Sequence, residues 1–285
     1  MTDSDLFFAR ANQLLERWEK AINGQPAPAD WTYDAYRWRH DGNGLRLAPV
    51  KNPHRVELDD LLCMDRQKAE VMRNTEQFMR GKPANNVLLW GARGTGKSTL
   101  IKAVFNAFVH RGLRLIEVEK EHLVDLVEIV ELIEERNERF LLYCDDLSFE
   151  ADDGGYKSLK AVLEGSIAAP SGNLLIYASS NRRHLLPEDK ADNQEARIVD
   201  GELHPGEAIE EKISLSERFG MWLSFYPFNQ EEYLAIVEHW LGRLDAGSCR
   251  DGVTRQAALN WARQRGSRSG RVARQFAVDQ AGRRA

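Results

Sequence analysis

The feature that most restricts the fold of this chain is the glycine-rich stretch GARGTGKS at residues 91–98. An apolar run at 86–90 precedes this stretch, and a helical segment at 99–105 follows it. The pattern G-x-x-x-x-G-K-S/T between a strand and a helix is typical of a loop that binds phosphate. A plain glycine-rich turn would not require Lys97 and Ser98 at these two places. The stretch therefore predicts a phosphate-binding loop in an α/β fold.

Each residue type in this loop has its own part in phosphate chemistry. Glycines let backbone N–H groups curl around phosphate oxygens, and the start of the next helix adds the positive end of a dipole. Lys97 is expected to neutralise β- and γ-phosphate oxygens, and the hydroxyl of Ser98 to bind Mg²⁺. The predicted nucleotide contacts are Gly91, Ala92, Arg93, Gly94, Thr95, Gly96, Lys97, Ser98 and Thr99.

Two acidic residues follow a second apolar run, Phe140–Cys144. A parallel strand that ends in acids delivers carboxylates to the edge of the sheet where the phosphate loop lies. Asp145 is expected to hold Mg²⁺, directly or through water. Asp146 occupies the position of a catalytic residue that orients the attacking water, where many ATPases have glutamate. An aspartate is one methylene shorter, so either the site rearranges slightly or hydrolysis is slow.

Two further polar residues are predicted to act on the γ-phosphate. Asn181 follows the apolar run at 174–178 and two serines, and its amide can sense phosphate and hold the water, although a lone asparagine after a strand is usually a turn former. Arg218 precedes the run at 222–226. It is either an ordinary surface ion pair or a finger that reaches the γ-phosphate of a neighbouring subunit.

The sequence after Pro227 has helical patterns only, at about 229–245, 254–265 and 269–282. It predicts a small helical lid after the α/β core. Arg271 opens the last helix and is expected to fold over bound nucleotide, although Arg268 or Arg274 could take that role. Such a role explains the arginine-rich tail better than DNA binding does.

Five buried strands separated by helices predict a parallel sheet sandwiched by helices. The expected strands are Val87–Trp90, Leu113–Val118, Phe140–Cys144, Leu174–Ala178 and Trp222–Tyr226, and the helices are 98–110, 121–136 and 155–168. The expected divisions are an N-terminal helical and aromatic segment (1–50), a nucleotide-binding core (51–227) and the lid (228–285).

The N-terminal segment combines a predicted helix at 5–22 with an aromatic stretch at 31–38. Aromatics beside arginines can stack on bases, but more often they pack a small segment onto its neighbour. The acid-rich stretch at 188–211 is interpreted as a flexible insertion, and the alternative is a loop that contacts a partner.

Composition excludes several classes of protein. The formal net charge of −5 gives no overall attraction to nucleic acid, so no strong sequence-specific DNA binding is expected. The sequence contains no apolar run of about 18 residues, so no membrane-spanning helix is predicted. The N-terminus does not have the pattern of a secretory signal. Three widely spaced cysteines argue against a disulfide framework or a zinc site. We expect a cytoplasmic protein.

These elements, in this order, resemble the AAA+ superfamily with its Walker A, Walker B, sensor 1, arginine finger and sensor 2. Residues 38–282 are closer still to a bacterial AAA+ ATPase family catalogued as a domain of unknown function, and more distantly similar to replication initiators and helicase loaders. The resemblance implies ATP and Mg²⁺ as cofactors, a homo-oligomer, and an adenine pocket at 56–62.

The leading functional hypothesis is an oligomeric ATPase that remodels a protein or nucleic-acid client. The alternative is a nucleotide-dependent switch or loader whose slow hydrolysis resets it, which the shorter Asp146 favours. A P-loop kinase for small molecules is disfavoured by Arg218 and by the helical lid.

Overall fold

The computed structural model describes residues 29–41, 44–149, 154–164, 172–183, 185, 197–199, 202–204 and 215–284. The strands are β1 (Ala35–Asp41), β2 (Gly44–Pro49), β3 (Val87–Gly91), β4 (Leu113–Val118), β5 (Arg139–Cys144), β6 (Leu174–Ser180), β7 (Arg197–Val199), β8 (Glu202–His204) and β9 (Met221–Phe225). The α-helices are α2 (Asp65–Met79), α3 (Lys97–Phe108), α4 (Leu126–Ile133), α5 (Gly154–Glu164), α7 (Gln230–Arg243), α8 (Gly252–Gln264) and α9 (Gly270–Arg284). Short 3-10 helices are η1 (Leu58–Asp60), η2 (Val109–Arg111) and η3 (Lys120–Asp125).

Within the described residues, a seven-stranded sheet has the order β2-β1-β4-β5-β6-β3-β9. The five strands expected from the sequence are confirmed as its parallel part, β4-β5-β6-β3-β9. β1 adds a further parallel strand next to β4, and β2 pairs antiparallel with β1 at the edge.

The two added strands correct one expectation. A helical and aromatic segment separate from the core was expected for 1–50, but residues 35–49 belong to the sheet. Tyr36 and Trp38 are two residues apart and completely buried, so the aromatic stretch follows the period of a strand. The aromatics pack into the core, which is the second of the two interpretations above. The predicted helix at 5–22 lies outside the described residues.

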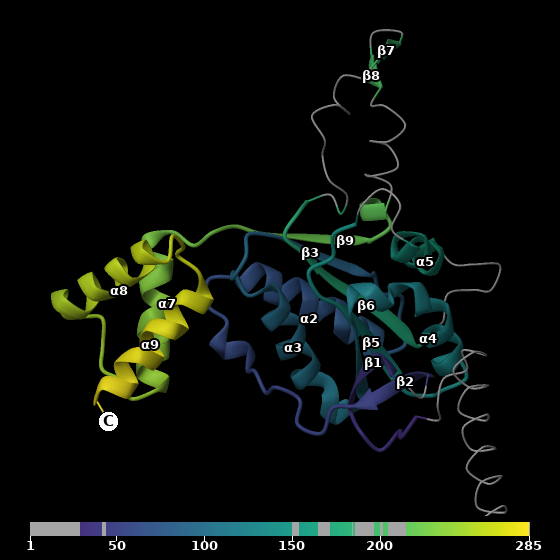
Figure 1. Cartoon of the computed structure of the whole chain (residues 1–285), viewed down its shortest axis with the longest axis horizontal. Helices are drawn as coiled ribbons and strands as arrows, with labels where there is room; N and C mark the ends of the chain where they lie inside the picture. The colour runs from purple at the N-terminus through teal and green to yellow at the C-terminus, as the bar shows by residue number, and fades with distance from the viewer. Residues whose placement is uncertain are drawn as a thin grey trace, which may run out of the picture.

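Helices cover both faces of the sheet (Figure 1). On β5, Leu141 and Tyr143 pack into one core cluster with α2 and α3, whereas Phe140, Leu142 and Cys144 pack into the other with α4 and α5. Strands buried on both faces are continuously apolar, which is why these runs could be read directly from the sequence.

The three lid helices α7, α8 and α9 follow β9 and form a bundle at one end of the molecule (Figure 1). The start of α7 is fixed by a capping box between Asn229 and Glu232. Asp60 of η1 joins the lid to the core through His239 Nε2 at 3.0 Å and Arg243 Nε at 3.1 Å. None of the helices in the described ranges is both long and apolar enough to span a bilayer.

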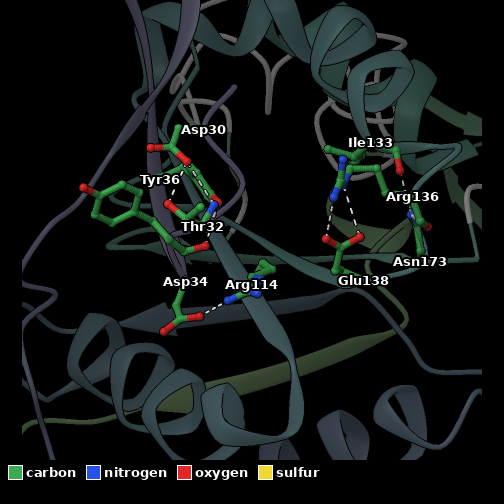
Figure 2. A network of polar contacts seen from close by, with 10 residues as sticks. Asp30, Thr32, Asp34, Tyr36, Arg114, Ile133, Arg136, Glu138 and Asn173 are labelled. Atoms are coloured by element: carbon green, nitrogen blue, oxygen red, sulfur yellow. Dashed lines mark hydrogen bonds and ion pairs between the residues drawn. The ribbon is translucent and has the colours of Figure 1, made fainter. Parts of the chain in front are cut away.

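A network of polar contacts connects the amino ends of the parallel strands (Figure 2). Asp34, just before β1, forms an ion pair with Arg114 of β4. Arg136 pairs with Glu138 at 2.6 Å, just before β5. The Asn173 amide, just before β6, donates to the carbonyls of Ile133 at 2.7 Å and Arg136 at 2.9 Å. These polar groups therefore satisfy one another at this end of the sheet.

Candidate functional site

The phosphate-binding loop connects β3 to α3 and is held between β9 and the lid. Gly91, Gly94 and Gly96 have φ values of 130°, 76° and 101°, a region that favours glycine. A Cβ on Gly91 would lie 2.0 Å from the carbonyl oxygen of Phe225. A Cβ on Gly94 would lie 2.8 Å from the side chain of Ser269. The loop therefore has no room for side chains at these positions and presents bare backbone.

The amine of Lys97 lies inside this loop and is almost fully buried. It donates to the carbonyls of Gly91 and Ala92, both at 2.8 Å, and to Asn181 Oδ1 at 3.2 Å. Burial lowers the pKa of Lys97, while the charges of Asp146 and Asp145 act in the opposite direction. These three acceptors are neutral oxygens, so an incoming anion would be a stronger partner for the ammonium group.

Asp145, at the end of β5, accepts hydrogen bonds from two serines. Ser98 Oγ donates at 2.7 Å and Ser179 Oγ at 2.5 Å. Burial alone would raise the pKa of Asp145, but the hydrogen bonds from Ser179 and Ser98 act against it, and that pKa is lowered. The carboxylate therefore remains ionised directly beside the hydroxyl of Ser98.

Asp146 and Asn181 lie next to this pair. Asp146 has a φ of 50°, and its backbone N–H donates to Ser179 Oγ at 3.1 Å. The Asn181 amide nitrogen donates to the carboxylate of Asp146, and its oxygen accepts from Lys97. Asn181 thus bridges the lysine and the second aspartate, so the ends of β3, β5 and β6 converge at one point.

A cleft of about 1250 Å³ opens above this cluster, between the core and the lid. The site residues expected from the sequence that line it are Arg93, Gly94, Thr95, Gly96, Lys97, Ser98, Thr99, Asp145, Asp146, Asn181 and Arg271. The apolar side chains that line it include Val56, Leu61, Leu62, Met64, Phe228, Ile236 and Trp240. Gly91 and Ala92 are not among the lining residues and contribute the carbonyls that hold Lys97.

A family model described as a protein of unknown function (DUF815) matches residues 31–284. The chain belongs to this family. Two solved variants of RuvB from Thermotoga maritima are similar in structure, with TM-scores of 0.53 and 0.51 and identities of 17% and 16%. Each match covers 78% of this chain, which spans 63% of the RuvB chain. The likeness shows an AAA+ P-loop NTPase fold. No curated protein matches the sequence.

Arg218, predicted to be either a surface ion pair or a finger for a neighbouring subunit, lies outside the cleft of its own chain. Its Nε donates to Glu164 Oε1 at 2.6 Å, on α5. The arginine is therefore held by an ion pair within its own chain, away from the phosphate-binding loop.

Of the three lid arginines considered, Arg271 and Arg274 line the cleft and Arg268 does not. The N-terminus of α9 contacts the loop, because the Gly270 N–H donates to the Gly94 carbonyl at 3.0 Å. Arg271 Cβ lies 3.8 Å from where a Cβ on Gly94 would be. Arg271 is therefore next to the phosphate-binding loop.

Two contributors were missed at the sequence level. Ser179 supports both Asp145 and the backbone of Asp146. Its position two residues before Asn181, at the end of a strand, was the available signal, since residues at that spacing share a face. Trp240 had no such signal, because only the folded lid brings it to the cleft.

Proposed function

We propose that this protein binds Mg–ATP in the cleft and hydrolyses it as a homo-oligomer, coupling the cycle to remodelling of a protein or nucleic-acid client. The observation that carries the proposal is the convergence of Lys97, Ser98, Asp145, Asp146 and Asn181 on a bare glycine loop. A buried ammonium group beside the backbone of a glycine-rich loop at the start of a helix suits a polyphosphate. The apolar side chains that line the cleft suit a flat base.

The donors present fit a magnesium ion. Mg²⁺ prefers oxygen ligands in an octahedron at about 2.1 Å, which puts neighbouring ligands about 3 Å apart. Ser98 Oγ and Asp145 Oδ1 are 2.7 Å apart. No cluster of three or more histidine, cysteine or acidic side chains is found in the described ranges, so phosphate oxygens and water would supply the other ligands.

The remaining residues support hydrolysis rather than binding alone. In this proposal Lys97 exchanges its carbonyl acceptors for phosphate oxygens, which releases Asn181 to hold water together with Asp146. Asp146 orients that water, and Arg271 balances charge on the γ-phosphate from the lid. The alternative, a slow switch, is favoured by the short side chain of Asp146, which would have to move to reach the water.

The position of Arg218 supports the proposal of an oligomer. Its place outside the cleft suits an arginine that acts in trans, on ATP bound to an adjacent subunit. Glu164 would then hold it only until the neighbour docks. In a monomer, by contrast, Arg218 would have no part in turnover.

A mixing experiment tests the proposal. Lys97→Ala should abolish high-affinity Mg–ATP binding measured by calorimetry, whereas Lys157→Ala, an exposed lysine away from the cleft, should not. Arg218→Ala should bind ATP normally but lower turnover by about a thousandfold. Mixing the Lys97→Ala and Arg218→Ala proteins should restore part of the activity. Unchanged ATP affinity in Lys97→Ala would refute the site, and a fully active Arg218→Ala monomer would remove the finger and the oligomer.

A further inference from the structure

The cleft holds two lid arginines, and their surroundings differ. Arg271, Arg274, Gln275 and Val278 line it at the spacing of one face of α9. Because α9 begins against Gly94 and rises about 1.5 Å per residue, this face leads away from the phosphate-binding loop. Arg274 starts about 4.5 Å further along the helix than Arg271.

Arg274 lies against an indole. Its guanidinium carbon is 5.1 Å from the ring centroid of Trp240, on α7. Trp240 and Ile236 are one turn apart on α7 and both line the cleft. Among the described residues Arg274 forms no ion pair, so the indole face is the contact that orients it.

We propose that Trp240 and Arg274 together form the wall that binds the nucleotide base. Of the two lid arginines that line the cleft, only Arg271 then contacts the phosphates. A guanidinium plane and an indole can both stack on the face of a purine. Val56, Leu61 and Leu62 of the core also line the cleft and supply further apolar surface. This wall makes the site selective for a large flat base, so that purine nucleotides bind more tightly than pyrimidine nucleotides.

This inference rests on the proposed function but adds a separate claim. The proposed function requires only that the triphosphate binds at Lys97. The inference assigns each of the two lid arginines to a different part of the nucleotide, Arg274 to the base and Arg271 to the phosphates. Two ratios of dissociation constants report these parts separately: ADP to ATP for the γ-phosphate, and UTP to ATP for the base.

The experiment measures Mg–ATP, Mg–ADP and Mg–UTP binding by calorimetry to the full chain and four variants. Arg274→Gln and Trp240→Leu should weaken ATP and ADP by the same factor, about tenfold, because base stacking is lost. Their preference for ATP over UTP should shrink by a similar factor. Arg271→Gln should instead reduce the preference for ATP over ADP. Arg268→Gln, the same change on a lid arginine outside the cleft, should alter neither ratio.

Arg274 is exposed, so its variant tests the claim even if Trp240→Leu disturbs the lid. The inference is overturned if Arg274→Gln changes the ADP-to-ATP ratio as Arg271→Gln does, or if it changes no affinity at all. A wild-type protein that binds none of the three nucleotides would overturn the proposed function itself. A third outcome would overturn the inference but leave the proposed function standing. In it, the wild-type protein binds ATP, Lys97→Ala abolishes that binding, and Arg274→Gln binds all three nucleotides as the wild type does.

Discussion

The two ends of the central sheet differ in how their charged side chains are paired. At the amino ends of the strands, Arg136 and Glu138 form a pair, and the hydrogen bond from Arg136 lowers the pKa of Glu138 (Figure 2). At the carboxyl ends, Lys97 is buried with neutral acceptors, and burial lowers its pKa. Two adjacent acids, Asp145 and Asp146, lie beside it. Side chains at the first end form opposite-charge pairs with one another, whereas in our proposal those at the second end bind a ligand.

Backbone strain is also present at the carboxyl end. Asp146, which directly follows β5, has a φ of 50°. A non-glycine residue in this conformation costs free energy, and such residues tend to occur at functional sites. The edge with the unfavourable groups is therefore the one to which our proposal assigns the chemistry.

The largest expected effect on stability comes from Gly91→Ala. Its Cβ would lie 2.0 Å from a backbone oxygen that cannot move without displacing β9. We expect a loss of about 3 kcal/mol or more in the free energy of unfolding, measured with urea. Gly112→Ala is the matched control, since Gly112 also has positive φ, 91°, but a Cβ there meets nothing within 4 Å. It should lose only about 1 kcal/mol, and equal losses would show that the loop is not tightly enclosed.

A smaller effect is expected from Ser179→Ala. This change removes the 2.5 Å hydrogen bond to Asp145 and the acceptor of the Asp146 N–H. Loss of such a supporting contact typically weakens metal binding by about tenfold or more. Titration of ATP binding with Mg²⁺ should therefore shift to higher concentration. Ser180→Ala, whose hydroxyl bonds the Leu147 carbonyl instead, should leave the titration unchanged. A shift of equal size in both variants would argue for a general loosening of β6.

Much of this site could be predicted from the sequence because its residues are tied to strand ends. The loop, Asp145, Asp146 and Asn181 each follow an apolar run, and parallel strands bring such residues to one edge. Neither the alternation of Tyr36 and Trp38 nor the pairing of β1 with β4 was recognised, since aromatics beside arginines also suit a helix or a surface.

Contacts between distant elements could not be predicted. Nothing in the local sequence indicates that Glu164 holds Arg218, or that Trp240 meets Arg274. Each contact joins two helices or loops whose relative position depends on the packing of the whole chain. For the same reason, the sequence could not decide which of Arg268, Arg271 and Arg274 reaches the nucleotide. The structure leaves Arg271 and Arg274 as candidates, because Arg268 does not line the cleft.

The smallest expected changes in unfolding free energy compare the two ends of the sheet most directly, because they are expected to have opposite signs. Lys97→Met removes a buried charge whose acceptors are neutral, so the nucleotide-free protein should gain about 1 kcal/mol in unfolding free energy at pH 7. Glu138→Gln removes a paired charge at the other end and should lose about 0.5 kcal/mol. Thermal and urea unfolding of both variants beside wild type measure the difference.

The pH dependence of these two differences follows from the direction of each pKa shift. The lowered pKa of Lys97 means that its cost is full at neutral pH and disappears as pH rises through that pKa towards the ordinary value of 10.5. The gain from Lys97→Met should therefore fade only at alkaline pH. The lowered pKa of Glu138 means that its contribution is full above the ordinary value of 4.5 and is lost as pH falls through the lowered pKa. The loss from Glu138→Gln should therefore fade only in acid. If Lys97→Met instead destabilised the nucleotide-free protein at pH 7, the lysine would be part of the structural support, and the contrast between the two ends of the sheet would fail.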